Sequence, residues 1–472
     1  MVQFTKLFIG GQWVEPSSTA TIEVHSPHDG RLIGVAPEGK PEDMNLAVKR
    51  AKHALDGEWS RMTPEQRQEI VTRFNTLHAA KTEELAALVS SENGTPISST
   101  TLLQSMVSHQ TDAYLRAASS FGWEEQLPSG ELVRKEAVGV VAAVIPWNAP
   151  QQSALVKVIP ALLAGCTVIL KASPETALDA LFLGDLFTEA GLPEGVLSII
   201  PAHREASEHL ISHPDVDKIA FTGSTAAGRK IASIAGEQLK RVSLELGGKS
   251  AVILLEDADL QAAVTALSYN SYGNNGEQCT AYTRVLAPRS RYEEIVEAIA
   301  AMVRSLPVGD PADPTTFIGP MVRADQKKRI QDYIRLGIEE GARLVVGGVE
   351  APEGLEQGNY VQPTLFADVN NNMRIAREEV FGPVLVVIPY DDEEEAIRIA
   401  NDSPYGLSGG VWAGDKEKGF QIARRIRTGV VSVNGVPAGF DAPFGGFKAS
   451  GIGREFGSVG LNAYVEYKTV SL

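Results

Sequence analysis

The stretch that decides the fold class runs from residue 138 to residue 171 and reads VGVVAAVIPWNAPQQSALVKVIPALLAGCTVILK. It begins with an apolar run of strand-forming residues over 138–145, continues with a helical pattern over 151–164, and ends with a second apolar run over 167–171. Pro160 lies inside the helical pattern and should bend that helix or end it early. Two buried strands joined by a helix form a right-handed crossover, so this stretch predicts parallel strands.

The same alternation extends toward the C-terminus. Helices are expected over 175–190, 204–212 and 225–235, and strands over 196–200 and 217–221. After Gly248 the pattern resumes, with strands expected over 251–255, 283–287 and 344–346 and helices over 291–306 and 324–341. Strands that alternate with helices in this way predict an α/β protein with doubly wound parallel sheets. Such sheets bind ligands beyond the carboxyl ends of their strands.

Further segments frame this pattern. On the N-terminal side, Thr63-Pro64-Glu65-Gln66 has the sequence of a capping box with proline at the first helical position, and it predicts a helix that ends near Asn93-Gly94. Segments 131–137 and 464–470 mix charged residues with strand formers, and we interpret them as arms of the kind that often join subunits.

Length and composition exclude several classes of protein. The chain has 472 residues, which at about 150 residues per domain corresponds to roughly three domains. Its formal net charge of −16 argues against a general nucleic-acid binder or a polybasic membrane binder. With two cysteines it is no disulfide scaffold. It shows neither the apolar core of a secretory signal nor an apolar run of membrane-spanning length, so we expect a cytoplasmic protein.

Cys279 is the candidate nucleophile. It lies in the turn Gly273-Asn274-Asn275-Gly276-Glu277-Gln278-Cys279-Thr280, and a thiol in a polar, glycine-containing turn is better placed to react than one in an apolar run. The alternative is a thiol without a chemical role at the end of a helix. Cys166 begins a predicted buried strand and is interpreted as a packing residue.

A carboxylate is the best candidate partner for that thiol. None of the eight histidines lies after His213 or in a recognisable catalytic motif. Glu245 stands between two leucines and before Gly247-Gly248, where burial would raise the pKa of its carboxyl toward that of a general base. The alternative is a surface glutamate on a half-exposed strand. The sequence has no HExxH motif, paired CxxC motif or EF-hand loop, so we expect no metal site.

Two strand ends indicate a cofactor crevice. Residues 221–228 lead from a strand through Gly223 and Ser224 into a helix, whose free N–H groups can bind an anion. Residues 171–175 close another strand, and Glu175 could bind ribose hydroxyls there. Both turns also suit an ordinary strand-to-helix connection.

Two glycine-containing segments are interpreted as structural. Residues 248–250 look like the end of a P-loop, but Ser243 stands where the first glycine should be and a strand follows, which argues against ATP binding. Residues 451–457 have the glycines of a dinucleotide loop but follow no clear strand, so we interpret them as a turn.

In this order, the segments resemble the NAD(P)-dependent aldehyde dehydrogenase superfamily over nearly the whole chain. Five motifs carry the resemblance: Pro146-Trp147-Asn148, Leu244-Glu245-Leu246-Gly247-Gly248-Lys249, Gly276-Glu277-Gln278-Cys279, Glu379-Val380-Phe381-Gly382-Pro383 and Pro443-Phe444-Gly445-Gly446. The resemblance implies a Rossmann-type parallel-sheet cofactor domain (1–120 and 138–247), an α/β catalytic domain (248–447), and a small β oligomerisation arm with a C-terminal segment (121–137 and 448–472). It also implies NAD as cofactor, an aldehyde substrate, and a homodimer or homotetramer.

The resemblance assigns roles to single residues. Cys279 falls on the nucleophile and Glu245 on the general base, while Asn148 and the backbone N–H of Cys279 fall on the oxyanion hole. Lys157 and Glu455 fall on a proton relay from the base. The residues that match cofactor contacts are Ile145, Pro146, Trp147, Lys171, Ser173, Glu175, Phe221, Gly223, Ser224, Leu246, Gly247, Glu379 and Phe381.

These residue types predict a sequence of steps. The Cys279 thiolate adds to the aldehyde carbon to give a hemithioacetal, hydride transfer leaves a thioester, and water deprotonated by Glu245 releases the carboxylic acid. Relatives that pass the acyl group to coenzyme A tend to lack this acid, so Glu245 favours hydrolysis. Glu175 would repel a 2′-phosphate, which favours NAD over NADP.

Some positions depart from the family pattern. Ala149, Ser153 and Val156 stand where bulkier side chains often narrow the substrate tunnel, so we expect a wider entrance that admits a bulky or branched apolar aldehyde. Residues 200–205 stand where many relatives have glycines near the adenine. Two other classes of function stay open: a cysteine hydrolase or esterase that needs no cofactor, and a non-catalytic binding protein that kept the fold.

Overall fold

The computed structural model describes residues 1–471, and its first sheet has eight strands in the order β20-β12-β11-β8-β9-β10-β2-β3. Five of these strands are parallel: β8 (Val140–Val144), β9 (Thr167–Ala172), β10 (Leu197–Pro201), β11 (Lys218–Thr222) and β12 (Arg241–Glu245). Short antiparallel strands complete the edges: β2 (Leu7–Ile9), β3 (Gln12–Val14) and β20 (Gly451–Ile452).

Helices cover both faces of this sheet. Successive side chains of a strand point to opposite faces, and accordingly Val141 and Val168 belong to one core cluster while Val140 and Ile169 belong to another. The first cluster packs against α2 (Pro64–Ala79), α4 (Ile97–Ser119), α5 (Pro150–Ala164) and α6 (Ala177–Glu189). The second packs against α1 (Pro41–Leu55), α7 (Arg204–Ser212) and α8 (Thr225–Glu237).

The second sheet has seven strands in the order β15-β16-β17-β14-β13-β18-β19. They are β13 (Ser250–Leu254), β14 (Tyr282–Pro288), β15 (Arg343–Val346), β16 (Thr364–Ala367), β17 (Val384–Tyr390), β18 (Gly409–Trp412) and β19 (Ser432–Val433), and β15 alone among them is antiparallel to its neighbour. Its helices are α9 (Leu260–Leu267), α10 (Tyr292–Arg304), α11 (Ala324–Glu339), α12 (Arg374–Arg377), α13 (Glu393–Asn401) and α14 (Lys416–Ala423). The predicted doubly wound α/β class is confirmed.

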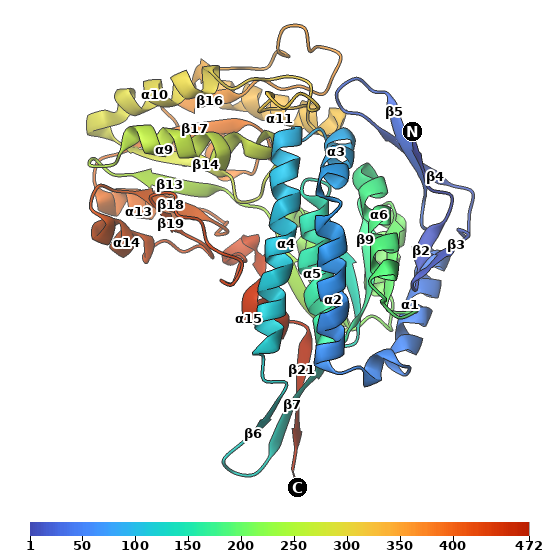
Figure 1. The fold of residues 1–472 in the computed structure, drawn as a ribbon. Helices are drawn as coiled ribbons and strands as arrows, with labels where there is room; N and C mark the ends of the chain where they lie inside the picture. The colour runs from blue at the N-terminus through green and yellow to red at the C-terminus, as the bar shows by residue number, and fades with distance from the viewer. Residues whose placement is uncertain (472) are drawn as a thin grey trace.

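Two small three-stranded sheets, one antiparallel and one mixed, lie outside these sheets. The first is an arm made of β6 (Glu124–Gln126), β7 (Leu132–Ala137) and β21 (Val465–Val470), which projects below the body of the molecule in Figure 1. Strands β6 and β7 follow α4, and β21 follows α15 (Gly457–Asn462), so the arm unites the two segments that the sequence predicts as arms. The second joins β1 (Val2–Gln3), β4 (Thr21–His25) and β5 (Leu32–Pro37), with β1 parallel to β5.

The prediction of a single helix between Thr63 and Asn93 is wrong in one respect, because this segment forms two helices. The capping box at Thr63 forms, and α2 ends at Ala79 before α3 begins at Thr82 and runs to Asn93. At the break, the hydroxyl of Thr82 donates to the carbonyl of Ala79. A side chain therefore satisfies a backbone acceptor that a continuing helix would have used.

Of the two effects predicted for Pro160, early termination of its helix is wrong, and a bend at this residue stays a prediction. Helix α5 continues past Pro160 to Ala164. Proline lacks the N–H that would bond the carbonyl four residues earlier, and here the hydroxyl of Tyr114 in α4 donates to that carbonyl, on Val156, at 3.2 Å. The same hydroxyl accepts from the backbone N–H of Phe456 at 2.8 Å.

The segment predicted as a turn over 451–457 is partly a strand. Gly451 and Ile452 form β20, which pairs with β12 at Glu245 and Leu244. Residues 250–254 form strand β13, so a strand and not a helix follows Gly248-Lys249, and this argues against a P-loop here.

None of the helices formed by residues 1–471 is both long and apolar enough to cross a membrane. Within the same range, no group of three or more His, Cys, Asp or Glu side chains is arranged to hold a metal ion.

Replacing Tyr114 with phenylalanine should destabilise the protein, since the Val156 carbonyl and the Phe456 N–H both lose their partner. We expect the free energy of unfolding to fall by about 2 kcal/mol, measured by urea denaturation. In a Pro160→Ala background, the restored N–H can bond Val156, so the same substitution should cost about half as much. Equal losses in the two backgrounds would contradict this account of Pro160.

Candidate active site

The chain crosses from the first sheet to the second within four residues. Strand β12 ends at Glu245 and β13 begins at Ser250, so the crossing segment is 246–249. A Cβ atom added at Gly247 would lie 2.3 Å from Oε2 of Glu379, and one added at Gly248 would lie 2.5 Å from the carbonyl oxygen of Cys279. A side chain at Gly248 would clash with the backbone, and one at Gly247 would displace the Glu379 carboxylate. The carboxyl ends of the first sheet therefore meet the amino ends of the second, where Cys279 precedes β14 and Glu379 precedes β17.

All five motifs that the sequence analysis singled out meet at this crossing. The side-chain amide of Asn148 donates to the carbonyl of Glu277 at 2.8 Å. A Cβ atom at Gly276 would lie 2.4 Å from the carbonyl carbon of Gly382, and one at Gly445 would lie 2.7 Å from Oε1 of Glu245. Together with the contacts of Gly247 and Gly248, these approaches place segments separated by up to about 300 residues around one cleft.

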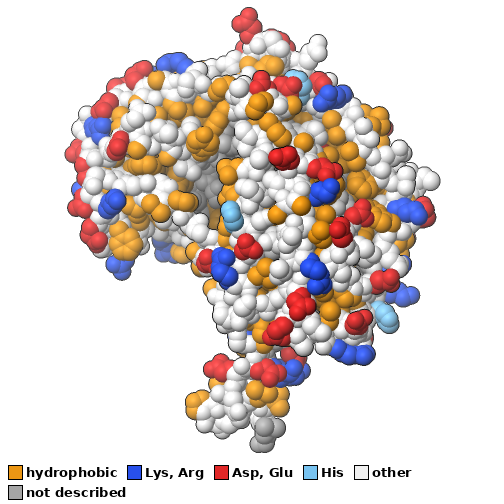
Figure 2. Space-filling model, in the orientation of Figure 1, with side chains coloured by type: hydrophobic (Ala, Val, Ile, Leu, Met, Phe, Trp, Pro, Cys, Tyr) orange, Lys and Arg blue, Asp and Glu red, His pale blue; other side chains and the backbone are white. Residues whose placement is uncertain are grey.

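Figure 2 shows this cleft as a hollow between the two lobes of the molecule, with hydrophobic side chains gathered on its rim. The lobe on the left of Figure 1 carries the second sheet, and the helices α2, α4 and α5 of the first lie to its right. An apolar rim favours entry of an apolar molecule over that of a charged one.

Cys279 is a free, partly exposed thiol. Burial, together with the carboxyl groups of Glu379, Glu245 and Glu455, raises the pKa of this thiol to about 12. The thiol is therefore protonated at neutral pH in the protein alone. Cys166, by contrast, is fully buried, and its Sγ lies 3.3 Å from the carbonyl oxygen of Tyr464. It packs in the core, as predicted.

Glu245 is buried, with 4% of its surface exposed, so the alternative of a surface glutamate is wrong. Neither of its carboxyl oxygens has a hydrogen-bond partner. Its pKa is raised well above the usual value by burial and by Glu455, while Lys157 and Arg454 act in the opposite direction. An unpartnered buried carboxyl of this kind is a candidate proton acceptor.

Lys157 and Glu455 form a buried ion pair beside Glu245. Nζ of Lys157 lies 2.6 Å from Oε1 of Glu455 and donates to Oγ1 of Thr222, also at 2.6 Å. Lys157 is fully buried and Glu455 is 8% exposed. The pair connects α5 of the first sheet to the segment after β20.

The predicted cofactor residues from the first sheet lie along its carboxyl edge. Ile145 follows β8, Lys171 lies at the end of β9, Phe221 at the end of β11, and Leu246 follows β12. Ser224 is the N-cap of α8, where its Oγ accepts from the N–H of Ala227 at 3.3 Å. The N–H of Gly223 donates to the carbonyl of Glu245 at 3.0 Å, which ties this turn to the crossing segment.

Charged groups surround the predicted ribose-binding acid, Glu175. Its carboxylate accepts from the hydroxyl of Ser173 and forms an ion pair with Arg323, the residue that precedes α11. Burial lowers the pKa of neighbouring Lys171 to about 8, while Glu175 acts in the opposite direction. Sequence reasoning missed Arg323, because it lies 148 positions from Glu175 in an unremarkable loop.

Glu379 and Phe381 lie on the opposite wall. Oε1 of Glu379 accepts from the N–H of Gly248 at 2.9 Å, and burial raises the pKa of this carboxyl. The ring of Phe381 meets the ring of Trp147 edge to face, with centroids 5.7 Å apart. Trp147, which directly follows Pro146, and the EVFGP motif thus come together across the cleft.

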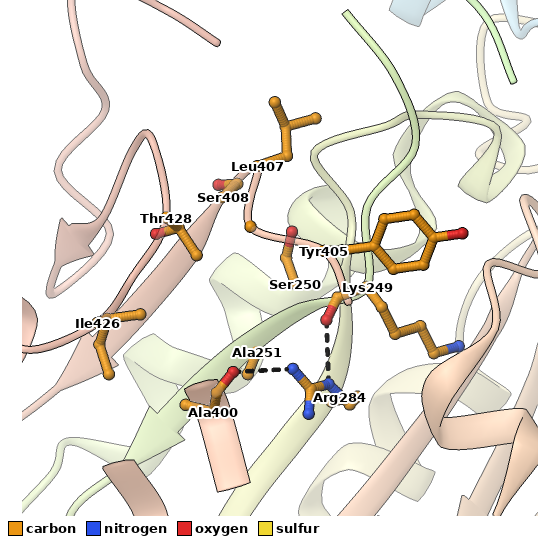
Figure 3. Close-up of a pocket in the computed structure, with 11 residues that line it drawn as sticks. Lys249, Ser250, Ala251, Arg284, Ala400, Tyr405, Leu407, Ser408, Ile426 and Thr428 are labelled. Atoms are coloured by element: carbon orange, nitrogen blue, oxygen red, sulfur yellow. Dashed lines mark hydrogen bonds between the residues drawn. The ribbon is translucent and has the colours of Figure 1, made fainter. Parts of the chain in front are cut away.

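Behind the crossing segment lies a small polar cavity, shown in Figure 3. Arg284 of β14 is 1% exposed, and its guanidinium donates to the carbonyls of Lys249 at 3.0 Å and Ala400 at 3.1 Å. It anchors the crossing segment to the second sheet. Sequence reasoning missed this role as well, although one arginine inside an otherwise apolar strand run was an available signal. Lys249 is also buried, and burial lowers its pKa to about 7.

The chain belongs to the aldehyde dehydrogenase family, whose model matches residues 13–470. Geranial dehydrogenase from Castellaniella defragrans is 46% identical over 472 residues, which are 99% of this chain and 98% of the relative. A solved aldehyde dehydrogenase from Mycobacterium tuberculosis, complexed with NAD+, is 45% identical with a TM-score of 0.96, and covers 100% of this chain and 98% of its own. A mutant of aldehyde dehydrogenase C from Pseudomonas syringae, complexed with NAD+ and octanal, is 39% identical with a TM-score of 0.96, and covers 99% and 96%. The protein is an oxidoreductase of this family, which confirms the resemblance predicted from its motifs.

Replacing Glu379 with glutamine should make Cys279 more reactive in the cofactor-free protein. The substitution removes a negative charge that raises the pKa of the thiol, so more thiolate forms at a given pH. At about pH 9 we expect alkylation by iodoacetamide to be several-fold faster, since each unit of pKa changes the thiolate fraction about tenfold. Mass spectrometry follows the labelling, with buried Cys166 as internal reference.

Glu378→Gln is the matched control for this experiment. Glu378 is the neighbouring acid, but it pairs with Arg374 and is not one of the carboxyl groups that raise the pKa of Cys279. If Glu379→Gln labels no faster than Glu378→Gln, the charge of Glu379 does not control the thiol.

Proposed function

We propose that the protein oxidises an aldehyde to the carboxylic acid with NAD, through a thioester on Cys279 that is hydrolysed by water activated by Glu245. The observation that carries the proposal is the buried, unpartnered Glu245 carboxyl at the same crossing as Cys279 and Asn148. A nucleophile, a carboxyl with a raised pKa and a side-chain amide at one cleft are the groups that acyl chemistry needs.

The first half of the reaction forms the thioester. The Cys279 thiol loses its proton toward the surrounding carboxylates, and Sγ forms a bond to the aldehyde carbon. The oxygen of that carbon becomes an oxyanion, and Nδ2 of Asn148 and the N–H of Cys279 donate to it. Removal of one such donor typically costs about 2.7–4 kcal/mol of transition-state stabilisation. Bound NAD supplies the acceptor for the hydride that then leaves the carbon.

The second half releases the acid. Glu245 takes a proton from a water molecule, the water oxygen bonds to the thioester carbon, and the bond to Sγ breaks. The ion pair of Lys157 and Glu455 then receives the proton from Glu245. One aldehyde, one NAD+ and one water yield one acid, one NADH and one proton.

The residues at the carboxyl edge of the first sheet fit this cofactor. The N-terminus of α8 offers free N–H groups for a pyrophosphate next to Gly223 and Ser224. The adenosine ribose contacts are Lys171, Ser173 and Glu175, and the carboxylate of Glu175 favours NAD over NADP. Glu379 holds the nicotinamide ribose, with Phe381 beside the ring. The remaining predicted contacts are Ile145, Pro146, Trp147, Phe221, Leu246 and Gly247.

The proposed substrate is a bulky or branched apolar aldehyde. Three small or medium side chains, Ala149, Ser153 and Val156, stand on the first turns of α5 next to Asn148. The apolar rim of the cleft in Figure 2 supports the same class. So do two relatives, one named for geranial and one solved with octanal.

The domain division and the assembly are part of this proposal. The first sheet corresponds to the cofactor domain, the second to the catalytic domain, and the arm of β6, β7 and β21 to an oligomerisation element of a dimer or tetramer. Two cysteines without a disulfide support a cytoplasmic location.

Aldehyde oxidation should depend on both NAD and Cys279. We expect NADH formation with a graded panel of aldehydes, greatest for branched or long apolar ones and lower with NADP. Cys279→Ser should reduce the rate by at least about 10³-fold and retain NAD binding, which calorimetry measures. Turnover without NAD would favour the cofactor-free hydrolase, and no turnover with any aldehyde would favour a binding protein.

Glu245→Gln should stop the reaction after hydride transfer. Stopped-flow absorbance should show a burst of about one NADH per active site, followed by a steady rate about 10²–10⁴-fold lower than wild type, because the base for hydrolysis is gone. Glu237→Gln on the exposed end of α8 is the control and should keep the wild-type rate. A normal steady rate in Glu245→Gln would assign the base to another group.

A further inference from the structure

The turn before Cys279 has an unfavourable backbone conformation. Asn274, Asn275 and Gly276 follow one another with φ values of 51°, 60° and 69°. The left-handed region costs a residue with a side chain roughly 1–2 kcal/mol, with asparagine tolerating it best. A succession of such residues persists only when surrounding contacts fix it.

A buried tetrapeptide at the end of α3, Glu92-Asn93-Gly94-Thr95, holds it from outside. Asn275 donates through Nδ2 to the carbonyl of Gly94 at 3.2 Å, and its Oδ1 accepts from the N–H of Gly319 at 2.7 Å. Asn93 donates through Nδ2 to the carbonyl of Trp147 at 3.1 Å. One short segment thus contacts both the turn before Cys279 and the loop that carries Asn148.

Thr95 makes the contact that decides how the Asn274 amide is oriented. Its hydroxyl, in a side chain that is 2% exposed overall, donates to Oδ1 of Asn274 at 2.6 Å. This bond leaves Nδ2 of Asn274 facing the carbonyls of Asn148, at 3.0 Å, and Glu277, at 3.2 Å. If the amide were flipped, its oxygen would face two carbonyl oxygens, so only one orientation is favourable.

The oriented amide joins the two sides of the oxyanion site. Nδ2 of Asn274 links the main chain of Asn148 to the main chain at Glu277, two residues before Cys279. Nδ2 of Asn148 donates to the same Glu277 carbonyl. A shift of Asn274 therefore moves the Asn148 amide relative to the N–H of Cys279, and oxyanion donors act only when both are in place.

We propose that Thr95 is a positioning residue for the oxyanion donor Asn148, and that it acts through the side-chain amide of Asn274. The proposal rests on the proposed function, because it takes Asn148 as that donor. Thr95 touches neither substrate nor cofactor in this role. Its hydroxyl fixes the distance between the two donors.

The test is a double-mutant cycle that measures kcat/KM for the aldehyde with saturating NAD. Thr95→Val removes the hydroxyl at nearly constant volume and should lower kcat/KM about tenfold, the effect of one buried hydrogen bond. Thr95→Ser should restore most of it. The dissociation constant for NAD should stay within about twofold of wild type, since the cofactor residues are untouched. Thr111→Val is the matched control, because Thr111 is equally buried and bonds only a carbonyl of its own helix.

The second half of the cycle separates this proposal from the proposed function. Asn148→Ala alone should lower kcat/KM about 10²–10³-fold, as expected for an oxyanion donor. In that background Thr95→Val should change kcat/KM less than about twofold, because its target is gone. If Asn148→Ala retains full activity, the proposed oxyanion site fails. If Asn148→Ala is impaired but Thr95→Val alone is as active as wild type, the positioning role is overturned. It is also overturned if Thr95→Val lowers kcat/KM by a further tenfold in the Asn148→Ala background. Should Thr95→Val fail to fold, Thr95→Ala serves in the same cycle with the same criteria.

Discussion

The structure depends on a steric constraint at the crossing between its two sheets. A Cβ atom at Gly248 would clash with the Cys279 carbonyl, and one at Gly247 would displace the Glu379 carboxylate from its position. This close approach lets the carboxyl edge of one sheet face the amino edge of the other at side-chain distance. Arg284 secures the same segment from behind through the carbonyl of Lys249. The absence of side chains at these two glycines allows the five motifs to approach one another at the crossing segment.

The buried charged side chains around the crossing differ in whether hydrogen bonds compensate for their burial. Arg284 is buried with its guanidinium bonded to several backbone and side-chain acceptors, so its burial is partly compensated, although burial still lowers its pKa to about 10, and the residue is structural. Glu245 is buried with neither oxygen bonded, so burial is uncompensated and appears as a raised pKa. The same contrast separates Lys157, paired with Glu455, from Lys249, which has no partner. Two of the buried groups without a hydrogen-bond partner, the Glu245 carboxyl and the Lys249 ammonium, thus lie at the two ends of the crossing segment.

Much of the fold is predictable from sequence because its strands are short apolar runs between helices. Each predicted strand of the central parallel sheet lies within two residues of its observed bounds, and motif order identified the residues that gather at the crossing. Three of the failures share one physical origin. Pro160 remains inside α5, where the hydroxyl of Tyr114 from another helix bonds the carbonyl that the proline cannot. The sequence around Arg323 and around Thr95 does not indicate that these side chains bond Glu175 and Asn274. Long-range hydrogen bonds override or complete local preference, and local pattern does not contain them.

Residues 451–452 return to the first sheet as strand β20, and this affects how that sheet folds while the chain is being synthesised. Strand β20 borders β12, and β21 pairs with β7, so the last two dozen residues complete structures whose other members emerge from the ribosome hundreds of residues earlier. Until then the edge of β12 lacks its partner β20, and Lys157 lacks the Glu455 carboxylate with which it pairs. The first sheet therefore cannot be completed before residues 451–452 have been made, and its closure is a late folding step with high contact order. A nascent chain stalled before residue 451 holds every strand of the second sheet but an unfinished active site.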